Sequence, residues 1–160
     1  MRPGQILVAD HAGVYIIKMT GDVRLTLCIS FDQFIDSMLA AANLSSVLFD
    51  LSEAEAVDST TLGLMAKISL LAQEKRNIIP VILATNASIK RILDTMGFAD
   101  IFKIVNKLDV EIEPEKPLSP IECDEKEVKE KVLEAHKILM GLNEQNRETF
   151  KNLVTMLENS

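Results

Sequence analysis

The sequence predicts an α/β fold, in which a mixed sheet with a central parallel portion packs against helices and is followed by a C-terminal helical extension. Short apolar runs bounded by turn residues alternate with stretches whose apolar residues recur at helical intervals. Two of these runs, residues 47–51 and 78–84, are apolar on both faces and enclose a helical stretch, which is the order of a parallel crossover unit. The 160 residues, 48% of them hydrophobic, suffice for one domain with an extension.

A β-hairpin is expected near the N-terminus, because residues 6–9 and 14–19 are apolar runs separated by a short turn. Gly21 is expected to interrupt the chain after the second strand. The first helix is expected to begin at Ser30, which lies three residues before Gln33, as in a capping box, and which precedes apolar residues at helical spacing.

The middle helix, residues 59–75, lies between the two buried strands and is apolar on several sides, as expected of a helix within the crossover. A third helix is predicted between Asn86, a favourable N-cap residue, and Gly97, which suits a left-handed C-cap. Residues 102–105 then predict a last edge strand.

The C-terminal part divides into a stiff proline-rich linker, residues 113–122, and a helical extension, residues 123–160, after a domain of residues 1–112. Apolar residues of the extension alternate four and three positions apart, which is a heptad seam with Asn146 inside it. Gly141 weakens this helix, so we expect a bend or a break into a short hairpin there. The seam must pack somewhere, and three options remain open: folding back on the domain, self-association, or docking on a partner.

Composition and charge disfavour several classes of partner. The net charge is −7 and aromatic residues make up 4%, whereas nucleic-acid binding needs a basic surface and often uses aromatic stacking. No apolar run approaches the roughly 18 residues of a membrane span, and an acidic surface repels anionic lipid. The N-terminus lacks the apolar region of a signal peptide, and two distant cysteines indicate free thiols in a reducing compartment. We therefore expect a cytoplasmic protein that contacts neither nucleic acid nor membrane.

Most signatures of catalysis and of cofactor binding are absent from the sequence. The two histidines, His11 and His136, are interpreted as solvated side chains, and no cysteine or histidine pair has the spacing of a zinc site. The glycines are isolated from one another, so no phosphate-binding loop is present. A Ser-His-Asp triad is formally possible, but no nucleophile elbow surrounds any serine. We therefore expect no catalytic residue, no metal and no cofactor, and an enzyme or nucleotide-binding domain is the least favoured interpretation.

Residues 57–63, Val-Asp-Ser-Thr-Thr-Leu-Gly, stand out because they join a buried strand to a buried helix after an acidic loop, residues 52–56. Ser59 lies at or next to the N-cap of that helix, where a hydroxyl satisfies a free backbone N–H. From the spacing alone, Ser59 is therefore interpreted as a helix cap.

The run from Asp58 to Gly63 resembles the D-S-[S/T]-G-L-G signature of the STAS domain family, the anti-sigma factor antagonists. The predicted order of elements and the end of the third helix, residues 97–100, are similar to that family as well. The resemblance covers residues 6–110, a normal length for one domain, and implies a STAS-type fold.

In that family, the serine directly after the aspartate is phosphorylated by a partner kinase that is also the anti-sigma factor, and this position corresponds to Ser59. The resemblance implies a bacterial protein-binding switch in signal transduction and transcription regulation. Its unphosphorylated form would bind the anti-sigma factor or a similar regulator with serine kinase activity, and a phosphatase would restore that form. The resemblance also implies a partner-binding surface around the serine, composed of Asp22, Arg24, Asp58, Thr60, Thr61 and Gly63.

Two positions depart from the family pattern. Thr61 replaces the first glycine of the signature, so Thr60 and Thr61 are competing phosphate acceptors, and Arg24 stands where family members often have a carboxylate. An arginine near the serine suits pairing with a phosphate, although an ordinary surface arginine is the simpler interpretation. These departures favour the single-domain STAS regulators with a helical tail that act in motility and biofilm pathways. The alternative is a constitutive adaptor in a larger assembly, such as a transporter-associated or stress-complex scaffold, in which Ser59 serves only as a cap.

Overall fold

The computed structural model describes residues 2–108 and 116–160, and its elements follow the predicted alternation of strands and helices. The strands in these residues are β1 (Gln5–His11), β2 (Val14–Val23), β3 (Ser46–Val57), β4 (Val81–Leu83), β5 (Lys103–Val105) and β6 (Lys116–Pro117). The α-helices are α1 (Cys28–Ala40), α2 (Ser59–Arg76), α3 (Ala87–Thr95), α4 (Glu125–Met140) and α5 (Glu144–Glu158). Two short 3-10 helices complete the set, η1 (Leu25–Leu27) and η2 (Phe98–Asp100).

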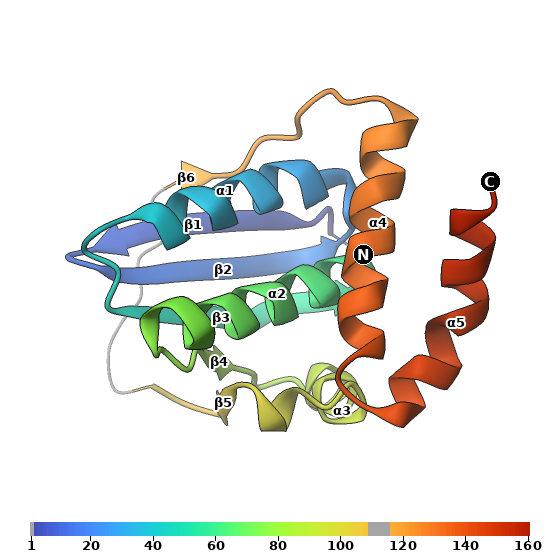
Figure 1. The fold of residues 1–160 in the computed structure, drawn as a ribbon. Coiled ribbons are helices and arrows are strands. Elements are labelled where there is room, and N and C mark those ends of the chain that lie inside the picture. Colours follow the sequence, from blue (N-terminus) through green and yellow to red (C-terminus); the bar gives the residue numbers. More distant parts are fainter. Residues whose placement is uncertain (1, 109–115) are drawn as a thin grey trace.

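The strands form one mixed sheet in the order β5-β4-β3-β2-β1-β6. Figure 1 shows α1 and α2 over one face of this sheet, and α4 runs across them near the ends at which they begin. α5 packs against α4, so the last two helices form an antiparallel pair at one end of the molecule (Figure 1). The predicted fold class, a mixed sheet packed against helices with a helical C-terminal part, is confirmed.

The N-terminal hairpin is also confirmed, since β1 and β2 pair antiparallel from His11 opposite Val14 outward. Ala12 and Gly13 form its turn with positive φ angles of 54° and 94°. The expected interruption at Gly21 is wrong, because β2 continues beyond it. Gly21 takes a φ of 69° next to an irregularity in the pairing with β3, and the glycine accommodates this bulge without ending the strand.

The central part of the sheet is parallel, as predicted. β3 pairs parallel with both β2 and β4, β5 extends the parallel portion, and α2 is the crossover helix from β3 to β4. β3 is longer than its apolar core, because residues 52–56, expected as an acidic loop, continue the strand beside β2. β4 is shorter than expected, since only Val81–Leu83 of the predicted run 78–84 forms a strand.

Two predicted helix boundaries are confirmed and one is wrong. The Asn86 side chain accepts two backbone N–H groups at the start of α3, and Gly97 beyond its end has a φ of 84°. α1 begins before Ser30, because the 3-10 turn η1 leads directly into it and no side chain caps its first turn. The Ser30 hydroxyl instead donates to the backbone carbonyl of Ser119, far along the chain.

The stretch expected as a linker contributes to the sheet. Residues 113–115 of that linker, and residues 109–112 at the end of the predicted domain, lie outside the described residues. Residues 116–117 form β6, which pairs antiparallel with β1. Together with the bond from Ser30 to Ser119, this pairing fastens the chain to the domain before α4 begins.

The C-terminal extension is a helical hairpin that folds back on the domain. α4 and α5 separate at Gly141, so the break into a hairpin is the form adopted. Ala135 and Leu139 of α4 are fully buried, and with Phe150 of α5 they belong to the same hydrophobic cluster as the sheet. Asn146, expected inside a coiled-coil seam, is buried within the chain and donates to two backbone carbonyl oxygens. Of the three options left open by the seam, this structure contains the first.

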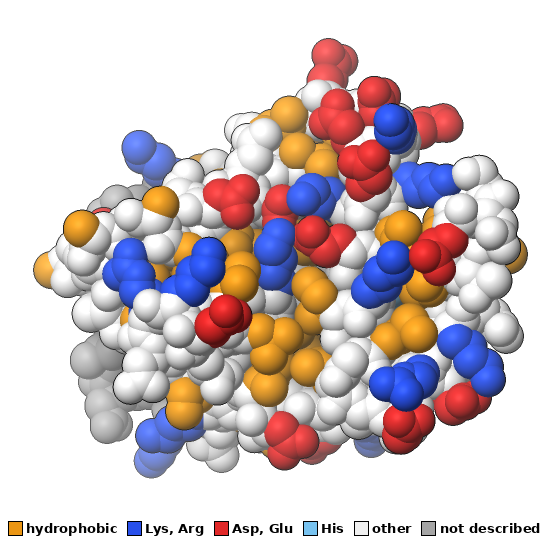
Figure 2. Space-filling model, viewed as in Figure 1, with side chains coloured by type: hydrophobic (Ala, Val, Ile, Leu, Met, Phe, Trp, Pro, Cys, Tyr) orange, Lys and Arg blue, Asp and Glu red, His pale blue; other side chains and the backbone are white. Residues whose placement is uncertain are grey.

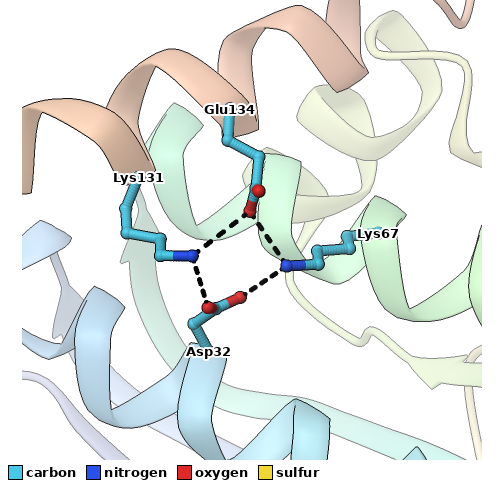
Figure 3. Close-up of polar contacts among 4 residues, drawn as sticks. All are labelled: Asp32, Lys67, Lys131 and Glu134. Carbon is cyan, nitrogen blue, oxygen red and sulfur yellow. Dashed lines mark hydrogen bonds and ion pairs between the residues drawn. The ribbon is translucent and has the colours of Figure 1, made fainter. Parts of the chain in front are cut away.

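Four charged side chains from three helices form a closed ring where α4 crosses α1 and α2 (Figure 3). The Lys67 Nζ of α2 lies 2.8 Å from a carboxylate oxygen of Asp32 in α1 and 2.9 Å from Glu134 in α4. The Lys131 Nζ of α4 lies 2.6 Å from the other oxygen of Asp32 and 3.8 Å from Glu134. Asp32 is the most buried member, with 7% of its side chain exposed.

The ring keeps Asp32 ionised despite its burial. Burial by itself would raise the pKa of the Asp32 carboxyl, but the hydrogen bonds from Lys131 and Lys67 together outweigh it and hold that pKa below its ordinary value of 3.8. Partial burial would likewise lower the pKa of each lysine, and the bonds to the carboxylates raise it instead. Asp32 and both lysines are thus charged at neutral pH, and their attraction stabilises the docked position of α4.

Deleting residues 124–160 is expected to leave the sheet and α1 to α3 folded, because the elements that form them precede the deletion. The free energy of unfolding should fall, by less than about 3–6 kcal/mol, because the core loses its contacts with Leu139 and Phe150, each worth about 1.5–3 kcal/mol before the entropy of ordering the hairpin is subtracted. Circular dichroism, light scattering and urea unfolding of the truncated chain measure this. A truncated chain without cooperative unfolding would contradict the division into a domain and an extension.

Replacing Asp32 with Asn is expected to lower the free energy of unfolding at pH 7 by about 1–3 kcal/mol, because two partly buried ammonium groups lose a carboxylate partner. Folding lowers the pKa of Asp32, so its contribution is present above about pH 4 and is lost as the pH falls through the lower folded value. Urea unfolding at several pH values should therefore show wild type and variant converging in acid. Asp36→Asn, an exposed position on the same helix, is the control. A difference in free energy of unfolding between wild type and Asp32→Asn that does not change with pH would contradict the ionic role.

Candidate functional site

The candidate site lies where β3 ends and α2 begins. Asp58 is the N-cap of α2, since its Oδ1 accepts the backbone N–H of Thr61 at 2.9 Å. Its own N–H donates to the carbonyl of Val23 at 3.1 Å, which fixes the junction against the end of β2. The interpretation of Ser59 as the helix cap is therefore wrong. Asp58 performs that role, and Ser59 is the first residue of the helix with its hydroxyl available for another contact.

The hydroxyl of Ser59 meets a histidine of the C-terminal extension. Its Oγ lies 2.7 Å from Nε2 of His136, and Nδ1 of the same ring lies 2.6 Å from the carbonyl oxygen of Val132. A carbonyl oxygen only accepts, so Nδ1 carries the hydrogen, and Nε2 of the neutral ring accepts the Ser59 O–H. His136 is 2% exposed and packs edge-on against Phe150, with ring centroids 5.0 Å apart. Its interpretation as a solvated side chain is wrong, because α4 carries it to the start of α2.

A glycine allows this approach of α4. Gly63 lies one turn after Ser59, on the same face of α2. A Cβ on Gly63 would stand 2.3 Å from the backbone carbonyl oxygen of Ala135, far inside contact distance. The backbones of the two helices therefore touch at this point, and α4 covers the first turns of α2.

The other predicted surface residues divide into an open group and a covered group. The open group includes Asp22 and Arg24, two positions apart near the junction. The Arg24 Nε lies 2.7 Å from Asp22 Oδ2, and 69% of the Arg24 side chain is exposed. The bond to Asp22, with a smaller contribution from Asp58, raises the pKa of Arg24 further. Asp58 and Ser59 are half-buried.

The covered group consists of Thr60, Thr61 and Gly63. The two threonines are 3% and 2% exposed, and Gly63 lies against α4. In this arrangement they help to pack the start of α2, while Asp58 and Ser59 are only half-buried and the Ser59 hydroxyl is bonded to His136. A partner-binding role for the six residues around the serine remains a prediction.

Acidic side chains before the motif are neutralised by cations. Glu55, near the end of β3, accepts from the Arg2 Nε at 2.9 Å, and Glu53 is paired with Lys18 of β2. The hydrogen bonds from Arg2 and Lys18 lower the pKa of Glu55 and Glu53, respectively. The negative charge next to Ser59 therefore comes chiefly from Asp58.

Metal and membrane sites are not found in the part of the chain that the structure describes. Among residues 2–108 and 116–160, no group of three or more histidine, cysteine or acidic side chains is placed to hold a metal ion. In the same residues, no helix combines the length and the apolar character that a bilayer crossing requires.

The comparisons with known proteins agree with this architecture. The family model of the STAS domain matches residues 5–110, well over half of the chain. Among solved structures, the fold is similar to the crystal structure of an anti-sigma factor antagonist from Mycobacterium paratuberculosis, with a TM-score of 0.56 and 23% identity over 67% of this chain and 89% of that chain. No curated protein matches the sequence.

The matched residues contain β1 to β5 and α1 to α3, and they end before the helical hairpin. His136 therefore lies outside the match, whereas Ser59 lies within it. The fold expected from the resemblance is the fold that this sequence adopts. The chain belongs to the STAS domain family.

Proposed function

We propose that this protein is a phosphorylation-controlled protein-binding switch of the anti-sigma factor antagonist type, without catalytic activity of its own. The observation that carries the proposal is the position of Ser59, which is the first residue of α2 and corresponds to the phosphorylated serine of the family signature. Because Asp58 already caps the helix, the Ser59 hydroxyl is not committed to holding the helix start.

A phosphate at this position would be held without unfolding the domain. The first turn of a helix presents backbone N–H groups and a partial positive charge, and this combination binds phosphate. The modification adds about −1.5 to −2 charges at neutral pH, next to the carboxylate of Asp58. A partner docked over Ser59 would then meet uncompensated like charge, which can cost several kcal/mol at an interface.

The proposed partners follow from the same role. They are an anti-sigma factor or a similar regulator with serine kinase activity, which binds the unphosphorylated form, and a phosphatase that restores this form. The structurally similar protein from Mycobacterium paratuberculosis is described as an anti-sigma factor antagonist, which supports this class of partner. The setting we propose is signal transduction to transcription in a bacterial cytoplasm.

A constitutive adaptor subunit is the second candidate, and one observation favours it. The Ser59 hydroxyl is bonded to His136 of the chain's own α4, so a purely structural role for this serine is consistent with the geometry. That role is to attach α4 rather than to cap α2. The two candidates differ in whether Ser59 is ever modified.

Phosphate is expected on Ser59, and not on Thr60 or Thr61, in protein isolated from its own cells. The two threonine side chains are almost fully buried at 3% and 2% exposure, so a kinase would reach them only after the start of α2 opens. Mass spectrometry locates the phosphate. As a control, the band that phosphorylation shifts on a phosphate-affinity gel should be absent in Ser59→Ala. Phosphate found only on a threonine would overturn the assignment.

Ser59→Ala is expected to bind constitutively to a partner isolated by pull-down from the protein's own cells. Ser59→Asp is expected to bind that partner at least about tenfold more weakly, because the added carboxylate repeats the charge of the phosphate. Calorimetry measures both affinities. Ser88→Asp, at the exposed start of α3, controls for a carboxylate at a helix N-terminus elsewhere. Equal affinities of the two Ser59 variants would favour the adaptor.

A further inference from the structure

α4 occupies the surface that the proposed switch needs. His136 of α4 accepts a hydrogen bond from the hydroxyl of Ser59. The neighbouring residue, Ala135, contacts Gly63 one turn further along α2. The ring of charged side chains follows after one more turn. One face of the first turns of α2 is thus covered by the chain's own helix.

We propose that the hairpin of α4 and α5 is a detachable cover of the switch surface, and that docking of α4 and phosphorylation of Ser59 exclude each other. With α4 docked, a kinase or a partner protein reaches Ser59 only by displacing that helix. With a phosphate on Ser59, α4 does not return, and the phosphate stays exposed to a phosphatase. This inference rests on the proposed role of Ser59 and adds that the chain itself controls access to that residue.

The exclusion follows from the geometry around the serine oxygen. Ser59 Oγ and His136 Nε2 are 2.7 Å apart, so with the serine side chain in its present rotamer a phosphoryl group on Oγ would occupy the place of the imidazole. The ring is 2% exposed and packed against Phe150, which leaves it little room to turn aside. Phosphorylation also removes the hydroxyl hydrogen, so the bond that Ser59 donates to Nε2 in the tautomer fixed by the carbonyl of Val132 is lost.

The attachment of α4 suits a cover that can leave. The chain before α4 is held to the domain by β6 and by the bond from Ser30 to Ser119, and residues 120–124 between that bond and α4 contain neither helix nor strand, so α4 could leave without breaking the sheet. The lysines and Glu134 of the charged ring are partly exposed, at 17%, 28% and 39% of their side chains, so water can replace these contacts. Figure 2 shows hydrophobic side chains between charged ones on the face that carries α2 and α4. A hollow lined by Leu133 and Ile138 lies along α4.

The covered surface also indicates the kind of partner that would replace α4. Gly63 admits only a backbone or a very small side chain, as Ala135 of α4 demonstrates. Lys67 and Asp32 of the domain pair with one another, and α4 supplies Glu134 to the lysine and Lys131 to the carboxylate. A partner protein is therefore expected to present a helix with a small residue against Gly63 and one acidic and one basic residue towards Lys67 and Asp32.

Gly63→Ala separates the cover from the domain. The new Cβ would lie 2.3 Å from the carbonyl oxygen of Ala135, a backbone atom that yields only if α4 moves. Alanine favours helix more than glycine does, so α2 itself is not weakened. Gly141→Ala is the matched control, because the nearest atom there, the carbonyl oxygen of Ile138, is 3.4 Å away.

Hydrogen–deuterium exchange of the full-length variants, read by mass spectrometry, measures whether α4 is docked. We expect residues 125–140 to exchange at least about tenfold faster in Gly63→Ala than in wild type while β3 stays protected, and Gly141→Ala to match wild type. Ser59→Glu, which places charge and bulk against His136, should release α4 in the same way. Ser88→Glu, at the exposed start of α3, should not.

Unchanged protection of α4 in both Gly63→Ala and Ser59→Glu would overturn the proposal. So would simultaneous loss of protection in α4 and β3, since α4 would then be part of the folding core and could not act as a cover. The experiment needs neither kinase nor partner, so it is independent of the proposed function. If α4 detaches in these variants but the protein is never phosphorylated in its cells, the proposed phosphorylation switch is refuted and the inference of a detachable hairpin stands.

Discussion

The contact between α4 and α2 at Gly63 is the constraint on which the arrangement at Ser59 depends. The backbone of Ala135 stands where a side chain on residue 63 would be, so any larger residue there would hold the helices apart. Because the helices touch, His136 reaches the hydroxyl of Ser59, and the charged ring closes between three helices. A missing Cβ thus sets both the packing of the C-terminal hairpin and the hydrogen bonding of the serine.

Local patterns are enough to predict most of the sheet and its helices, because those elements depend on neighbours in sequence. The hairpin turn, the parallel crossover through α2 and the cap at Asn86 all follow from residue types a few positions apart. Contacts between distant segments leave no such trace, which is why β6 on β1 and the bond from Ser30 to Ser119 are not foreseen. At Gly21 the pattern misleads, since a positive φ serves a bulge as well as a turn.

The candidate site divides in the same way. A motif within six residues identifies Ser59, but His136 lies 77 positions further on and belongs to no recognisable pattern. The heptad seam that contains Ala135 indicates that one face of the helix packs, without indicating against what. The small residue Gly63 inside a helix was the available sign, because a glycine that costs helix stability is often retained for a close approach of another backbone.

Charge balance explains why the docked state suits an unmodified serine. The ring combines two ammonium groups with two carboxylates and so brings no net charge to the junction of α2 and α4. The acidic side chains near the end of β3 are already paired, and the carboxylate of Asp58 is engaged at the N-cap. The guanidinium of Arg24, which follows β2, is bonded to Asp22. A phosphate on Ser59 would add about −1.5 to −2 charges to a junction whose charges are already matched. It would also remove the hydroxyl hydrogen that Nε2 of His136 accepts, so the bond that fastens α4 to the unmodified serine is lost once the serine carries a phosphate.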